Sequence, residues 1–267
     1  MSIVFAFVHR SVLRFVRRPD IIVSTVIFPI LLLLTLHAVF SVAVENFEDG
    51  AAYGQRLVPT LVFSGIMFGS LGTAMGIFQD MQSGWMDRLR SMPIRPLAPL
   101  AGTVLAEAVR ALLAVVALVA VGFLFDFRFS NGVLSTVGFV VVAAVSSMTI
   151  AWIGIYFAIG AKSQEAMAGP LNAVFLLLLF LSRGMVPLEA YPGWVQPVVR
   201  ANPATAYVTL LDRLARGGEL VQPFLFAGAW TIAISAVFGT LAVRRLQSAG
   251  GRAPETDSVA APEPTPA

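Results

Sequence analysis

The segment from Gln79 to Leu100 reads QDMQSGWMDRLRSMPIRPLAPL, and it decides how the rest of the chain is expected to fold. It places charged residues between two apolar runs that are each long enough to cross a bilayer. Charged side chains are costly inside lipid, so this segment is expected outside the membrane and its neighbours inside it. The sequence therefore predicts a membrane protein with a charged connection between two of its spans.

The composition supports the same conclusion. Apolar residues make up 57% of the 267 residues and charged residues only 12%, whereas about a quarter of the residues in soluble domains are charged. The first residues carry arginines after their apolar positions and lack an A-x-A-like cleavage site, so we expect no removable signal peptide. Cysteine is absent, which excludes disulfides, thiolate metal sites and cysteine nucleophiles.

Apolar runs of spanning length predict an all-α membrane protein with six transmembrane helices. Arginines gather before the first span, between the second and third, and after the sixth, so both termini are expected in the cytoplasm. We expect one membrane domain over residues 1–247 and a disordered cytoplasmic tail over residues 248–267, which lacks a hydrophobic face. The spans are expected at about residues 22–44, 57–79, 102–125, 133–159, 168–186 and 222–243.

Before the first span, arginines share one helical face and apolar residues another, which predicts an amphipathic interfacial helix. The basic face consists of Arg10, Arg14, Arg17 and Arg18. Pro19 is expected to end this helix, and Asp20 can cap the next one. Two interpretations stay open: an electrostatic anchor to anionic lipid, and a helix that also touches a cytoplasmic partner.

The second span carries a stripe of glycines at helical spacing, which lets another backbone approach closely. The stripe consists of Gly65, Gly69, Gly72 and Gly76. Packing against a helix of the same chain is favoured over a contact between subunits, because such stripes are common in membrane bundles.

The charged segment itself predicts a short helix over residues 84–92. Ser83 can cap its start, and Pro93 ends it because the residue before a proline is pushed out of helical geometry. Trp85 and Leu89 lie on one face, which could press into the groove of a partner protein. The alternative is a small amphipathic helix that rests in the lipid headgroups with its tryptophan at the interface.

Two motifs resemble those of ABC-2 type exporter permeases, and especially their daunorubicin-resistance-like branch. The first is similar to the family's acidic-x-x-x-Gly-x-x-x-Arg-Leu-Arg-x-x-Pro loop, and falls on Asp80, Gly84, Arg88, Leu89, Arg90 and Pro93. The second is similar to its outer V-P, P-G-W and N-P elements, and falls on Val186, Pro187, Pro192, Gly193, Trp194, Asn202 and Pro203. The resemblance covers about residues 3 to 246.

This resemblance implies a type V ABC exporter fold, in which two six-span permeases pair and each receives an ATPase subunit on its cytoplasmic face. The second permease is either identical or paralogous. ATP and Mg would then act on the partner ATPase, with no cofactor on this chain, and the expected location is the bacterial inner membrane. The resemblance assigns the coupling helix to residues 84–92. Its coupling residues would be Asp80, Gly84, Trp85, Asp87, Arg88, Leu89, Arg90 and Pro93.

The outer segment before the last span predicts a helix of its own. Asn202 is a good N-cap, Pro203 suits the first helical position, and helix-forming residues follow until Gly217. We expect this helix at the outer membrane surface. That location would let the arginines of the segment sit in water or headgroups, namely Arg183, Arg200, Arg213 and Arg216.

Polar groups inside the spans are the remaining candidates for function. Glu107 and Arg110 are three residues apart in the third span, and mutual neutralisation is favoured over contact with a ligand. His37 and Asn172 are single polar groups, and each is expected to hydrogen-bond within the bundle. The fifth span resembles the family helix that lines the subunit seam. Its candidate path for a hydrophobic or lipid-like cargo consists of Asn172, Phe175, Phe180 and Arg183.

These observations favour an export permease that is not itself an enzyme. The nucleotide-binding loop G-x-x-x-x-G-K-[ST] is missing, since the nearest fragment, over residues 160–163, lacks the glycine before its lysine. Metal chemistry and nucleic-acid binding are not expected. An ion-driven secondary carrier or channel is the alternative, and it would need carboxylates along a path through the membrane. A membrane scaffold that transports nothing is a third hypothesis.

Overall fold

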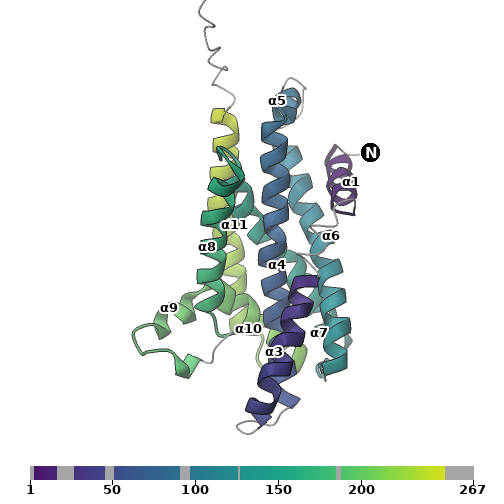
Figure 1. The fold of residues 1–267 in the computed structure, drawn as a ribbon, viewed down its shortest axis with the longest axis vertical. Helices are drawn as coiled ribbons and strands as arrows, with labels where there is room; N and C mark the ends of the chain where they lie inside the picture. The colour runs from purple at the N-terminus through teal and green to yellow at the C-terminus, as the bar shows by residue number, and fades with distance from the viewer. Residues whose placement is uncertain are drawn as a thin grey trace, which may run out of the picture.

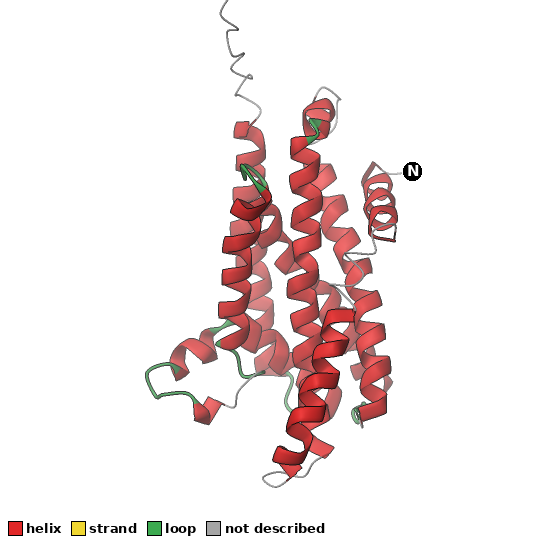
Figure 2. Ribbon diagram, viewed as in Figure 1, coloured by secondary structure: helices red, strands yellow, loops and turns green. Residues whose placement is uncertain are grey.

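The computed structural model describes residues 3–16, 27–45, 51–90, 97–125, 127–184 and 188–249, which form helices joined by turns, without a strand in these ranges (Figure 1, Figure 2). The helices are α1 (Ile3–Val16), α3 (Phe28–Glu45), α4 (Ala51–Gln82), α5 (Trp85–Arg90), α6 (Leu97–Gly122), α7 (Gly132–Ala158), α8 (Gln164–Phe180), α9 (Gln196–Ala201), α10 (Pro203–Arg216) and α11 (Val221–Ala249). Two 3-10 turns are η2 (Phe123–Phe125) and η3 (Leu188–Ala190). The all-α fold class is confirmed.

Within these ranges, four segments are long and apolar enough to cross a bilayer: Leu57–Gln82, Ala98–Phe125, Gly132–Ala158 and Val221–Ser248. They overlap the second, third, fourth and sixth expected spans. The first expected span begins at residues 22–26, outside the described residues, and the structure describes its continuation as α3. Pro19, Asp20 and the basic residues Arg17 and Arg18 also lie outside the described residues.

The fifth expected span differs most from its helix, because residues 168–186 were expected and α8 covers Gln164–Phe180. At its start, the side chain of Ser163 accepts a hydrogen bond from the amide of Ala166 and caps the helix earlier. At its end, side chains of later residues bind the last carbonyls. With 17 residues α8 is about 25 Å long, short of a hydrocarbon core of about 30 Å.

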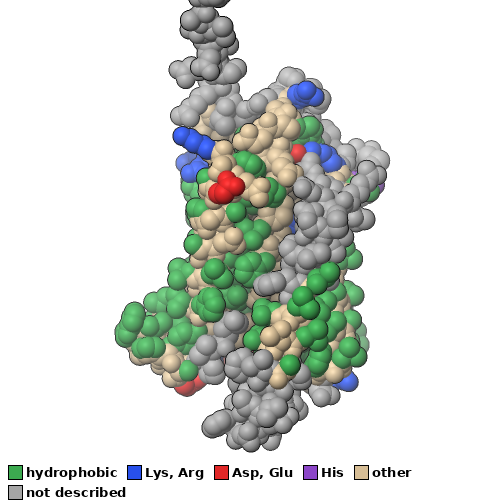
Figure 3. All heavy atoms as spheres, viewed as in Figure 1, with side chains coloured by type: hydrophobic (Ala, Val, Ile, Leu, Met, Phe, Trp, Pro, Cys, Tyr) green, Lys and Arg blue, Asp and Glu red, His purple; other side chains and the backbone are tan. Residues whose placement is uncertain are grey.

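The two ends of the bundle differ in what they carry. Helix α5, the start of α1 and the last turns of α11 lie at one end, and η3, α9 and α10 lie at the other (Figure 1). The expected placement of both termini on one side agrees with this arrangement. Charged side chains in the face shown in Figure 3 gather mainly near the two ends, with apolar side chains between them.

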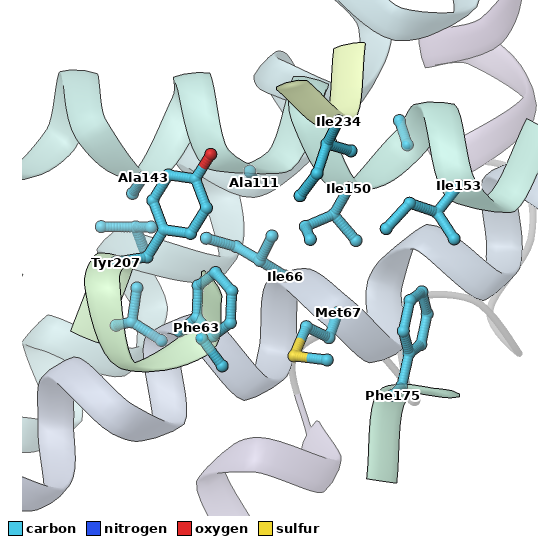
Figure 4. Close-up of a cluster of buried hydrophobic side chains, with 14 of the residues drawn as sticks. Phe63, Ile66, Met67, Ala111, Ala143, Ile150, Ile153, Phe175, Tyr207 and Ile234 are labelled. Carbon is cyan, nitrogen blue, oxygen red and sulfur yellow. The ribbon is translucent and has the colours of Figure 1, made fainter. Parts of the chain in front are cut away.

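Helix α4 lies at the centre of the bundle and packs against α3, α6, α7, α8 and α10. Its residues Phe63 and Met67 lie in a core that includes Ile150 from α7 and Tyr207 from α10 (Figure 4). The rings of Phe63 and Tyr207 stack with centroids 5.4 Å apart. Burial of this aromatic pair holds α10 against α4. Helix α10 therefore does more than rest on the membrane surface, because one face of it is core.

The glycine stripe of α4 packs within the chain, as the favoured interpretation had it. A Cβ atom on Gly65 would lie 3.3 Å from Pro29 in α3 and 3.6 Å from Leu118 in α6. Gly72 and Gly76, about two and three turns further on, face a cleft between helices. The stripe thus allows close packing at Gly65 and leaves an open space at Gly72 and Gly76.

Candidate functional site

The charged connection begins where α4 ends. Gly84 has a φ of 66°, a left-handed conformation that glycine adopts without strain, and it reverses the chain into α5. The expected helix over residues 84–92 therefore starts one residue later, at Trp85. The hydroxyl of Ser83 donates to the carbonyl of Asp80, 3.2 Å away, in the last turn of α4.

The carboxylate of Asp80, in the last turn of α4, binds Arg10 of the N-terminal helix α1. Nη1 of Arg10 lies 3.1 Å from Oδ2 and Nη2 lies 2.8 Å from Oδ1, so the pair is bidentate. Asp80 is buried, and the side chain of Arg10 is 34% exposed. Charge-assisted pairs of this geometry are stronger than single hydrogen bonds and fix orientation.

The same arginine also covers the tryptophan of α5. Its Cζ atom lies 3.7 Å from the ring centroid of Trp85, a cation–π contact. Phe7 of α1 meets this ring edge-on, with centroids 5.8 Å apart and an interplanar angle of 89°. The face of Trp85 that was expected to meet a partner protein is therefore packed against α1. We call Phe7, Arg10, Asp80 and Trp85 the inner clamp.

The remaining described side chains of α5 differ in their burial. Met86 is 3% exposed and belongs to the core, whereas Arg88 is exposed on the surface of α5. Pro93 lies outside the described residues, as do the side chains of Asp87, Leu89 and Arg90, whose backbone belongs to α5.

Helix α1 itself packs along α6, so the clamp links α4 and α5 to α6 through α1. The amphipathic helix was expected to lie on the membrane surface, and the structure adds a contact with the bundle. His9 and Leu13 remain on its exposed side. The side chain of Arg14 lies outside the described part of the structure.

A polar cleft separates the inner clamp from a second charged cluster. It encloses about 460 Å³, its open mouth included, between α1, α4 and α6. Small residues line it on α4 and polar groups lie at its two ends. Its lining residues are Ser11, Gly72, Thr73, Gly76, Ile77, Asp80, Thr103, Ala106, Glu107 and Arg110.

The second cluster is the pair expected in the third span. Glu107 and Arg110 form an ion pair, 2% and 7% exposed, and both bind the hydroxyl of Thr73 in α4. Nη2 of Arg110 lies 2.7 Å from this hydroxyl, which itself donates to Glu107. Removing one partner of a buried pair typically costs about 3–5 kcal/mol. Both charged residues belong to α6, so it is their shared contact with Thr73 that joins α6 to α4. No sequence pattern pointed to Thr73 as the third member of this cluster.

The candidate cargo path does not form one surface in a single chain. Phe175 is fully buried against the core, and Asn172 is half-buried. Phe180, the last residue of α8, is 59% exposed, and Arg183, which follows the helix, is also exposed, whereas Phe175 points inward (Figure 4). One side of α8 packs on α4 and α7, which accounts for the burial of Phe175, and the cargo path stays a prediction.

The outer helix is the expectation that the geometry matches most closely. Asn202 precedes α10, and its Oδ1 accepts from the amide of Ala204 at 2.8 Å. Pro203 occupies the first turn, and Gly217, with a φ of 92°, ends the helix. The outer arginines are exposed, namely Arg183, Arg200, Arg213 and Arg216.

Comparison with known proteins identifies the family. A sequence profile described as ABC-2 type transporter matches residues 3–213, well over half of the chain. The chain belongs to the ABC-2 type transporter family. This ABC-2 protein is 26% identical over 230 residues to a probable doxorubicin resistance ABC transporter permease protein of Mycobacterium tuberculosis, covering 86% of this chain and 82% of the relative. It is 28% identical over 234 residues to a daunorubicin resistance ABC transporter permease protein of Streptomyces coeruleorubidus, covering 88% and 79%.

A further relative, the doxorubicin resistance ABC transporter permease protein of Mycobacterium tuberculosis, is 27% identical over 200 residues, covering 73% of this chain and 69% of the relative. Family and relatives agree with the motifs around Asp80 and Asn202. The ABC-2 chain is the membrane-embedded permease subunit of an ABC exporter.

Proposed function

We propose that this permease exports a hydrophobic or amphipathic cargo, of the drug or lipid class, and that separate ATPase subunits drive it through α5. The observation that carries the proposal is the inner clamp. It binds α5 to the ends of two helices at once, through Asp80 of α4 and Arg10 of α1. A force applied to α5 would therefore reach both helices.

The partner is proposed to dock on the solvent-exposed side of α5, which carries Arg88. ATP and Mg belong to that partner, and the chemistry takes place there. The exposed charge of Arg88 suits recognition of an acidic group, because rim charges steer and orient a partner. Asp87, Leu89, Arg90 and Pro93 complete the proposed coupling segment.

The membrane placement follows from the same end of the bundle. With α5 facing an ATPase in the cytoplasm, the start of α1 and the end of α11 are also cytoplasmic, and α9 and α10 face outward. The bacterial inner membrane is the proposed location, since the relatives come from Mycobacterium and Streptomyces. A second permease, identical or paralogous, is proposed to complete the transport path beside α8.

The names of the relatives support the class of cargo, since they refer to resistance against doxorubicin and daunorubicin. Both are suitable test cargoes. The alternative of an ion-driven carrier is less well supported, because the carboxylates of Asp80 and Glu107 in the described inner half of α4 and α6 each bind an arginine.

The test is transport of doxorubicin into inverted proteoliposomes that contain this permease and its ATPase. We expect uptake to require ATP, and Arg88→Glu to abolish the stimulation of ATP hydrolysis by cargo by reversing the docking charge. Arg200→Glu, at an exposed arginine of the opposite end, is the matched control and should behave as the parent. Uptake without any ATPase would instead support the carrier.

A further inference from the structure

The outer end of α8 is held by side chains from other elements. The last carbonyls of a helix lack partners within it. In α8 two of them, those of Leu178 and Leu181, accept from Nδ2 of Asn202 at 2.8 Å and 2.7 Å. Two separate bonds from one amide thus close the end of this helix.

A tyrosine binds the neighbouring carbonyls. The hydroxyl of Tyr191, between η3 and α9, lies 2.6 Å from the carbonyl oxygen of Phe180 and 3.2 Å from that of Ser182. A tyrosine hydroxyl is protonated at neutral pH, and partial burial raises the pKa of Tyr191 further above its ordinary value.

Two threonines attach the next residues to α4 and α10. Thr60 of α4 donates to the carbonyl of Gly184 at 3.2 Å, and Thr205 of α10 accepts from the amide of Arg183 at 3.2 Å. Gly184 comes so close that a Cβ atom there would stand 2.7 Å from the Thr60 hydroxyl. We call Thr60, Tyr191, Asn202 and Thr205 the outer clasp.

Asn202 has a double role in the clasp. Its Nδ2 binds the end of α8 while its Oδ1 caps the start of α10, so one side chain joins two helices. It is 6% exposed, and Thr60 and Thr205 are also buried. Little water is therefore at hand to replace these bonds if the helices separate.

We propose that Asn202 is a positioning residue that makes α8, α9 and α10 move as one rigid body with the outer end of α4. Movements that open the outer side during transport then occur at the boundary of this body rather than within it. The link to transport rests on the proposed export function. The fixed separation between α8 and α10 can be measured without any cargo.

The experiment uses spin labels, for which the absence of native cysteine is an advantage. Cysteines are placed at the exposed Leu177 of α8 and Arg213 of α10, and their distance distribution is measured in the assembled transporter with and without ATP. We expect the same distribution in both states. A shift of its maximum on ATP binding would overturn the proposal.

The variant Asn202→Asp keeps the cap of α10 and loses both bonds to α8, replacing the donor with a charge that repels the carbonyls. We expect the distribution to broaden and ATP-driven doxorubicin uptake to fall about tenfold, the size expected when a buried hydrogen bond is lost. Ser163→Ala is the matched control, because it removes the cap at the other end of α8 and should leave both readouts at the parent level.

If Asn202→Asp does not fold, Tyr191→Phe removes a single hydroxyl and should broaden the same distribution to a smaller extent. An unchanged width and unchanged uptake in the folded variants would refute the role of Asn202. A parent that moves no cargo would count against the export function alone, since the distances between labels are measured independently of transport.

Discussion

The inner clamp and the outer clasp hold the two ends of the bundle by different kinds of interaction. The inner clamp is one ion pair between Arg10 and Asp80, with a tryptophan beside it. The outer clasp is a set of neutral hydrogen bonds between side chains and backbone groups around the end of α8, and the side chains of Thr60, Asn202 and Thr205 are buried.

The difference in burial decides how each responds. The side chain of Arg10 is 34% exposed, so water and salt weaken its attraction to Asp80, and partly exposed pairs typically contribute about 1 kcal/mol or less. Water competes less with the buried side chains of Thr60, Asn202 and Thr205, and each group left unpaired there costs about 1–3 kcal/mol. The end proposed to meet an ATPase is thus easily rearranged, and the opposite end resists rearrangement.

The largest effect is expected from removing the threonines of the clasp. The double variant Thr60→Val, Thr205→Val keeps the shape of both side chains and leaves the carbonyl of Gly184 and the amide of Arg183 without these bonds. We expect the free energy of unfolding in mixed micelles to fall by about 2–4 kcal/mol. Thr240→Val, whose exposed hydroxyl binds only its own helix, is the control. A loss no larger than that of the control would mean that the clasp is not rigid.

A smaller effect is expected at the inner end. Arg10→Met and Asp80→Asn, alone and together, form a double-mutant cycle with an interaction energy of about 1 kcal/mol in unfolding. Each single variant should lower the stimulation of ATP hydrolysis by cargo severalfold, because α5 loses a link to α1. Additive effects in the cycle would show that the ion pair does not couple these helices.

The smallest effect comes from salt alone. Raising the ionic strength from about 0.1 M to about 0.5 M shortens the Debye length from about 10 Å to about 4 Å. The interaction energy between Arg10 and Asp80 should then weaken by a few tenths of a kcal/mol, as for partly exposed ion pairs. The loss caused by the threonine double variant should not change with salt, and a similar change at both ends would remove the contrast.

Local signals predicted much of this architecture. Apolar runs gave the all-α class and the positions of the long helices, and Asn202 with Pro203 gave the start of α10 to the residue, since a cap and a first-turn proline act within a few positions. The pairing of Glu107 with Arg110 was also expected, because residues three apart meet on one helix face.

Contacts between distant residues were out of reach. Arg10 and Asp80 are 70 positions apart, and the helical spacing of the arginines could not tell which of them would meet a carboxylate. For the same reason Trp85 was assigned to a partner and Phe175 to a cargo path, although one packs on α1 and the other on the core. A single sequence shows that a face is apolar, and only the fold shows what covers it.

The uninterrupted length of α4 gives this arrangement a mechanical consequence. Thr60, held to Gly184, and Asp80, held to Arg10, belong to one helix and stand about 30 Å apart at 1.5 Å per residue. Pro59 lacks an amide hydrogen and makes the helix easier to bend at this point. A rotation of about 5° there would displace the Asp80 end by about 2.6 Å over that length. Such a rotation would move the residues around α5 while the hydrogen bonds of the outer clasp stay intact.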